Sequence, residues 1–130
     1  MNKLPPALVF LRILVALLLF IHGATRLYLG GVTPFGEYLS GRGFPAGVAI
    51  AWAITIFELT GTLVLAAGRF VIPLAAGFIW NLAWGIVLVH ASAGWFVVGA
   101  GRNGMEYSIL LIGCLITLIL TELQRKSSKV

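Results

Sequence analysis

The sequence predicts an all-α membrane protein, a transmembrane bundle of four helices, and three observations carry this prediction. Hydrophobic residues make up 60% of the 130-residue chain, and its mean hydropathy is +1.04. Charged residues make up only 10%, whereas a soluble domain carries about 25%. The apolar residues also gather in runs close to the roughly 20 residues that a helix needs to cross a bilayer. We therefore expect a single membrane domain over residues 1–130.

Helix-start and helix-stop residues bound the four apolar runs. Pro5 and Pro6 suit the start of the first helix, and Pro73 suits the first turn of the third. Gly30 and Gly68 follow the first and second runs, where glycine commonly ends a helix. We expect helices over about residues 7–28, 47–67, 72–90 and 105–123.

Two glycine-rich loops separate these helices. Residues 30–46 contain five glycines and two prolines, so we expect no spanning element there. Phe35, Tyr38 and Phe44 in this loop favour a lid that folds back onto the bilayer surface. Residues 91–104 form the second loop, which carries aromatic residues suited to the membrane interface.

Basic residues predict the orientation. Four spans place both termini on one side, and that side holds most of the positive charge, whereas the opposite loops hold only Arg42 and Arg102. The residues on the richer side are Lys3, Arg69, Arg125, Lys126 and Lys129. This bias predicts a multi-pass protein of the inner (cytoplasmic) membrane with both termini in the cytoplasm. The net charge of +5 forms no basic face, so we expect a lipid bilayer and no nucleic acid as partner.

Ionisable residues inside the spans are the candidate site. A charge at the bilayer centre costs at least about 2.5–3.5 kcal/mol, so it usually faces protein or water and often marks function. The candidates for ligand or proton handling are Arg12, His22, Arg26, Glu58, His90 and Glu106. The supporting residues are Gly23, Thr55, Asn81 and Trp84. Polar stripes on the first, second and fourth helices should converge in the bundle.

The charges inside the spans suggest two ion pairs. Depths counted from the helix ends, at about 1.5 Å per residue, predict a deep Arg12–Glu58 pair and a shallow Arg26–Glu106 pair. Such pairs have two interpretations. They handle a ligand or protons directly, or they serve only to fix which helix faces which.

The two histidines are the better candidates for proton transfer, because imidazole titrates near neutral pH. They lie on different helices with no third ligand at a diagnostic spacing, so we expect no metal site. Asn81 and His90 are nine residues apart, which places them on opposite faces of an ideal helix. Either the third helix breaks before His90, or only one of the two faces the interior.

Two strings in the chain, LRILVALLLFIHGATRLYLG and FELTGTLVLAAG, are similar to the first and second helices of the DoxX family of small integral membrane proteins. The stretch from His90 through GWF to GRNGMEYSILL is similar to the start of its last helix, so the resemblance extends over essentially the whole chain. The family motif positions correspond to Arg12, His22, Gly23, Arg26, Glu58 and Gly61.

The resemblance implies a four-helix membrane bundle, named after subunits of quinone-linked sulfur oxidation systems. It favours a membrane subunit associated with a quinone-linked oxidoreductase, with quinone as the cofactor. The chain has no haem, flavin or metal motif. It would therefore not be catalytic alone, and electrons would come from a protein partner, a soluble redox enzyme or other membrane subunits. Two alternatives stay open: a non-catalytic anchor or assembly subunit of a larger complex, and a small transporter.

Overall fold

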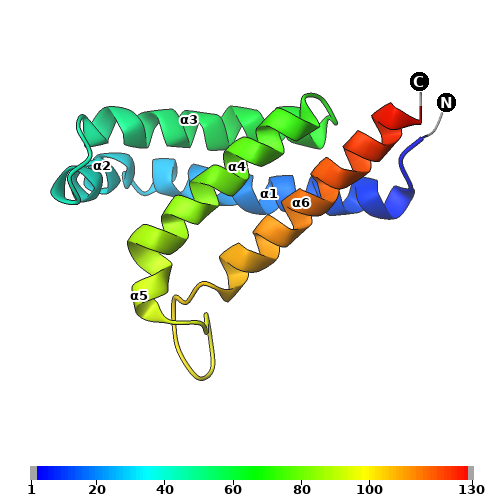
Figure 1. Cartoon of the computed structure of the whole chain (residues 1–130). Coiled ribbons are helices and arrows are strands. Elements are labelled where there is room, and N and C mark those ends of the chain that lie inside the picture. The colour runs from blue at the N-terminus through cyan, green and yellow to red at the C-terminus, as the bar shows by residue number, and fades with distance from the viewer. Residues whose placement is uncertain (1–2, 129–130) are drawn as a thin grey trace. The chain divides into compact units, whose positions relative to one another are not determined.

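The computed structural model describes residues 3–128 and is all-α, with no strand among those residues (Figure 1). Four of its helical segments are long and apolar enough to cross a membrane. They are Pro6–Tyr28, Gly47–Ala66, Val71–Ala93 and Glu106–Ser127. The predicted fold class is confirmed, and the predicted boundaries agree with these segments to within a few residues. Lys129, one of the basic residues used to predict the orientation, lies outside the described residues.

The chain divides into two compact units. One unit is Ala16–Arg69, and the other combines residues 3–15 with residues 70–128. The first helix, α1 (Pro6–Tyr28), contributes its second half to the Ala16–Arg69 unit and its first half to the other.

The Ala16–Arg69 unit contains a helix that the sequence does not predict. After α1, the chain forms α2 (Val32–Gly41), followed by α3 (Gly47–Ala66). Pro34 lies in the first turn of α2, where proline breaks no helical hydrogen bond. At the other end, Gly43 has a φ of 92° and the Phe44 N–H donates to the Leu39 carbonyl, which closes the helix C-terminus. Residues 32–41 are thus helical where the sequence predicts a loop, although α2 is too short to be one of the candidate spans, as expected of residues 30–46.

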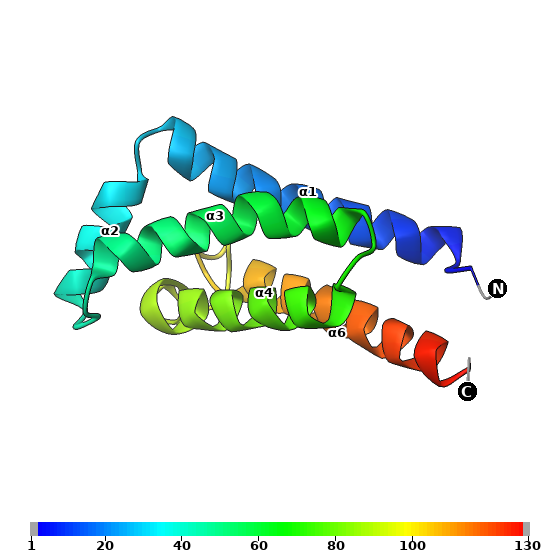
Figure 2. The same cartoon turned by 90° about the horizontal axis from the view of Figure 1, so that it is seen from above.

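Two glycines hold α2 against the start of α3, where Figures 1 and 2 show the two helices packed together. A Cβ atom on Gly36 would lie 2.7 Å from the Val48 backbone nitrogen. One on Gly47 would overlap the Gly36 carbonyl oxygen and the Ser40 side chain. Both glycines are needed because the two backbones touch. One of the glycines that suggested a broken loop, Gly36, is thus a residue that lets α2 dock.

The second unit is built on the packing of α4 (Val71–Gly85) against α6 (Glu106–Ser127), seen in Figure 1. Ala75, Phe78 and Leu115 are completely buried there. Between these helices the chain forms η1 (Ile86–His90), a π-helical turn, and the short α5 (Ala91–Ala93). The regular α-helix therefore ends before His90, as the first of the two alternatives for Asn81 and His90 required. π-Helical turns are rare and occur frequently at functional sites.

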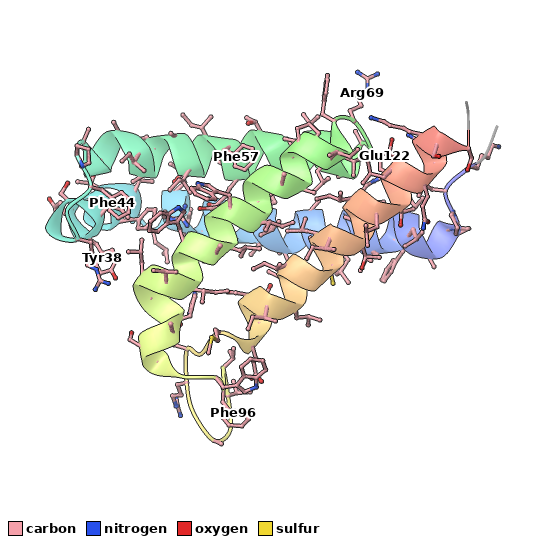
Figure 3. All side chains as sticks on the ribbon, in the orientation of Figure 1. Tyr38, Phe44, Phe57, Arg69, Phe96 and Glu122 are labelled. Atoms are coloured by element: carbon pink, nitrogen blue, oxygen red, sulfur yellow. The ribbon has the colours of Figure 1, made fainter. Side chains whose placement is uncertain are left out.

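The end of α6 extends past the predicted boundary at residue 123. The extra residues are polar, and one of them, Arg125, forms an ion pair with Glu122 at 2.6 Å. The pair is an i,i+3 contact along one face of the helix. Glu122 lies near the C-terminal end of α6 (Figure 3).

Candidate functional site

A buried ion pair joins α1 to α3 in the Ala16–Arg69 unit. The Nη1 atom of Arg26 lies 2.6 Å from Oε2 of Glu58 and 3.1 Å from Oγ1 of Thr55. The Glu58 side chain is only 3% exposed and the Arg26 side chain 14%. We call Arg26, Glu58 and Thr55 the Arg26 cluster. A charge-assisted hydrogen bond of this length is among the stronger polar contacts that a protein makes.

Arg26 pairs with Glu58, so the predicted shallow Arg26–Glu106 pair is wrong. Glu106 instead accepts a hydrogen bond from the backbone N–H of Val97 at 2.9 Å. Arg12 and Glu58 belong to different units, so the predicted deep Arg12–Glu58 pair stays a prediction. Arg12 carries a buried Nε atom that has no hydrogen-bond partner within the part of the chain that the structure describes.

The predicted pairing assumed that depth in the membrane can be counted from the helix ends. Arg26 lies in the last turn of α1, whereas Glu58 lies in the middle of α3. The two still meet because α3 starts beside α2, beyond the end of α1, so the two helices do not begin at one level (Figure 2). Arg26 lies two residues before the end of α1 and Glu58 eleven residues after the start of α3, a difference of nine residues, or about 13 Å at about 1.5 Å per residue. Counting from the ends of α1 and α3 assumes that they are level.

Gly23 and Thr55, two of the predicted supporting residues, both lie against the Arg26–Glu58 pair. A Cβ atom on Gly23 would lie 2.8 Å from the Glu58 Cβ and 3.0 Å from Glu58 Oε2, so α3 approaches α1 closely only because residue 23 is glycine. Thr55 is completely buried, and its hydroxyl donates to the Ala51 carbonyl at 2.8 Å. That bond orients the hydroxyl oxygen to accept from Arg26.

Phe35 of α2 covers the arginine. Its ring centroid lies 4.7 Å from the Arg26 Cζ, which is a cation–π contact. The sequence places Phe35 in a loop expected to fold back, but gives no indication that it would contact Arg26. The signal that could have found it is the run from Val32 to Leu39, in which buried Val32, Gly36 and Leu39 recur at helical spacing.

Only one of the three guanidinium nitrogens of Arg26 donates hydrogen bonds to residues 3–128. All of its hydrogen bonds to described residues run through Nη1. The Nε and Nη2 atoms, with three N–H groups between them, donate to no residue in the described part of the chain. Glu58 thus balances the charge of Arg26, while the Nε and Nη2 side of the planar guanidinium can still donate to an acceptor.

The remaining candidates are not among the three residues of the Arg26 cluster. His22 is exposed on α1, one turn before Arg26. In the second unit, Asn81 is half-buried, and Trp84 stacks edge-on against Trp80 with ring centroids 5.9 Å apart. The Nδ1 atom of His90 lies 2.8 Å from the Asn103 carbonyl oxygen. His90 and Glu106 therefore both contact the loop that follows α5.

No group of three or more histidine, cysteine, aspartate or glutamate side chains within residues 3–128 is arranged to hold a metal ion. The donor set of the Arg26 cluster, a guanidinium with one carboxylate and one hydroxyl, suits a ligand with acceptor oxygens.

Comparison with known proteins gave one finding. The family model described as DoxX matches residues 7–91, which is well over half of the chain and includes α1, α2, α3 and α4. The matched range contains the whole Arg26 cluster but ends before the GRNGMEYSILL stretch. No match was found among curated proteins or solved structures. The chain, with its four candidate membrane spans, therefore belongs to the DoxX family of membrane proteins.

Proposed function

We propose that this DoxX family protein is a membrane subunit of a quinone-linked oxidoreductase, and that the Arg26 cluster holds the polar end of a quinone. The observation that carries the proposal is the Arg26–Glu58 pair, buried between two candidate spans with one edge of the guanidinium unused. Ionised groups inside spans are costly and are kept where they act on a ligand, an ion or a proton.

The chemistry of the cluster fits a quinone head group. A quinone carbonyl oxygen accepts hydrogen bonds, and the Nε and Nη2 edge of Arg26 supplies donors with a fixed planar geometry. Glu58 neutralises the arginine, so the cluster takes a neutral ligand without leaving a bare charge in the membrane. The Phe35 ring on the guanidinium gives the head group an apolar neighbour.

Bound quinone would supply the two-electron redox chemistry, and the chain would bind and orient it. Electrons come from a protein partner, either a soluble redox enzyme or another membrane subunit. We place the protein in the inner (cytoplasmic) membrane as one membrane domain with both termini in the cytoplasm. The bias of basic residues towards that side supports this orientation.

Quinone content tests the proposal. The wild-type protein, purified from membranes in mild detergent, is extracted with solvent and its quinone is measured against protein. We expect close to one quinone per chain in the wild type and a loss of at least tenfold in the Arg26→Gln/Glu58→Gln double variant, in which both charges are removed together. Glu37→Gln is the matched control, because Glu37 is exposed on α2. A wild type that carries no quinone and binds no soluble analogue would rule the proposal out.

The two alternatives give different results in the same preparations. In an anchor or assembly subunit, the Arg26–Glu58 pair fixes helix pairing only, so the single variants lose stability while no preparation contains quinone. In a transporter, proteoliposomes containing the wild type move a cation or an organic substrate, and the double variant does not.

A further inference from the structure

The loop between α5 and α6, residues 94–104, is folded. It doubles back on itself through four backbone hydrogen bonds of 3.0–3.2 Å. Asn103 and Gly104 donate to the carbonyls of Val97 and Phe96, while Met105 and Glu106 donate to those of Gly94 and Trp95. Gly104 is packed so tightly that a Cβ atom there would overlap the Trp95 backbone. The loop therefore has one defined shape, although it contains no regular secondary structure beyond α5.

Two of the candidate residues, His90 and Glu106, form hydrogen bonds to the backbone of this loop. The Glu106 carboxylate accepts from the Val97 N–H at 2.9 Å. The His90 Nδ1 lies 2.8 Å from the Asn103 carbonyl oxygen, and since a carbonyl only accepts, Nδ1 carries the proton. One contact comes from the last residue of η1 and the other from the first residue of α6. The ends of the two flanking spans thus fix the loop from both sides.

The folded loop displays apolar side chains outward. Trp95 is 48% exposed, Phe96 45% and Val98 73%. Figure 3 shows Phe96 in the loop that joins α5 to α6. The only charged residue between positions 94 and 104 is Arg102, which is exposed. A loop that projects into water would usually be polar, so these side chains require an apolar neighbour.

We propose that the 94–104 loop is a preformed membrane anchor whose Trp95, Phe96 and Val98 side chains enter the boundary between lipid headgroups and acyl chains. The loop joins two candidate spans, Val71–Ala93 and Glu106–Ser127, so it lies at the membrane surface. Tryptophan is enriched at that boundary, and arginine extends its charge towards the headgroups. Arg102 contacts lipid phosphate.

The hydrogen bonds of the loop satisfy part of its backbone, and the hydrated headgroup boundary supplies partners for the remaining N–H groups. Irregular backbone is excluded from the apolar part of a membrane when its N–H and C=O groups have no partners. Here the backbone N–H groups of Val97, Asn103 and Gly104 are all satisfied, one of them by the Glu106 carboxylate. The loop also loses little conformational freedom on insertion because it is already ordered.

Spin-label accessibility tests this anchor. In a Cys114→Ser background, Val98→Cys carries a nitroxide, and Glu37→Cys, at an exposed position of α2, is the control. Both proteins are placed in vesicles of phosphatidylcholine and phosphatidylglycerol, and collision with lipid-soluble oxygen is compared with collision with a water-soluble nickel chelate. We expect the residue 98 label to collide preferentially with oxygen and the residue 37 label with the chelate. Preferential collision of the residue 98 label with the chelate, or protection from both reagents by a protein contact, would overturn the proposal.

Two variants of Glu106 test whether its carboxylate keeps the 94–104 loop ordered. Glu106→Gln keeps an oxygen that accepts from Val97 and should leave the residue 98 label unchanged. Glu106→Leu removes the acceptor and should increase the mobility of the label and reduce its collisions with oxygen at least twofold. If Glu106→Leu left both unchanged, the loop would not depend on this contact and the preformed anchor would be wrong.

Discussion

Arg26 and Glu58 form their ion pair although one lies in the last turn of its helix and the other in the middle of its own. The short helix α2 makes this possible by occupying the space beyond the end of α1, beside the first turns of α3. The same helix brings Phe35 over the guanidinium. A segment outside the spans therefore both sets the register of the ion pair and covers it.

Removing one charge of the pair should destabilise the protein far more than removing both. Glu58→Gln leaves Arg26 buried without a counter-charge, which costs about 3–5 kcal/mol in the free energy of unfolding. Arg26→Gln/Glu58→Gln should recover most of that loss, since neither charge then remains. The measurement is reversible unfolding in mixed detergent micelles, with Glu37→Gln as the control of unchanged stability. If the single and double variants lost the same free energy of unfolding, an unpaired buried charge at Arg26 would not be the cause of the loss.

A methyl group at position 23 should separate α1 from α3. The added Cβ would lie 2.8 Å from the Glu58 Cβ, so Gly23→Ala should cost about 1–3 kcal/mol through overpacking. Gly113→Ala on α6 is the matched control, because a Cβ there meets nothing within 4 Å. That control should be neutral or gain up to about 1 kcal/mol from helix propensity. A stable Gly23→Ala protein would contradict the close approach of the two helices.

Substitution of Gly47 should release α2 while leaving the spans folded. A Cβ at this position overlaps the Gly36 carbonyl and the Ser40 side chain, at a cost of about 1–3 kcal/mol. We expect amide hydrogen exchange in residues 32–41 to become faster in Gly47→Ala, by about tenfold for each 1.4 kcal/mol lost. Gly41→Ala, where a Cβ has open space around it, should exchange like the wild type. Unchanged exchange in Gly47→Ala would mean that α2 does not depend on this contact.

The aromatic ring of Phe35 should stabilise the protein by more than an apolar side chain of similar size would. Phe35→Leu keeps an apolar side chain but removes the contact with Arg26, worth about 0.5–2 kcal/mol. Phe35→Tyr keeps the ring face and should retain wild-type stability. Repeating both substitutions in the Arg26→Gln/Glu58→Gln background isolates the cation–π contribution, because the Leu and Tyr variants should then become equivalent. A difference between them that persisted without Arg26 would assign the effect to packing alone.

The sequence was sufficient to predict the spans, because a run of about 20 apolar residues has few other stable states. Its glycines and prolines also located the span boundaries to within a few residues. Two residues of the Arg26 cluster, Arg26 and Glu58, were identifiable because charges in such runs are rare. Gly23 and Thr55 followed from helical spacing. These inferences depend on local pattern alone.

The partners within the candidate site could not be predicted in the same way. Which carboxylate meets Arg26 depends on the relative level of α1 and α3, and that level is set by α2. The helix α2 was missed because five glycines and two prolines in residues 30–46 indicate a loop, whereas one of these glycines, Gly36, is a packing contact against α3. The role of Glu106 was missed for a similar reason. Its carboxylate binds the backbone N–H of Val97, and a backbone partner leaves no trace in the sequence.

Photo-crosslinking with an azido-quinone tests the central claim most directly, because it reports where the head group lies. The wild-type protein in nanodiscs is illuminated with the probe, with and without excess unmodified quinone, and the labelled peptides are identified by mass spectrometry. The account predicts labels on α1 around Arg26 and on α3 around Thr55 and Glu58. It also predicts that they are suppressed by the competitor and absent from Arg26→Gln/Glu58→Gln. Labelling that the competitor does not suppress, or competitor-sensitive labels confined to α6, would contradict it.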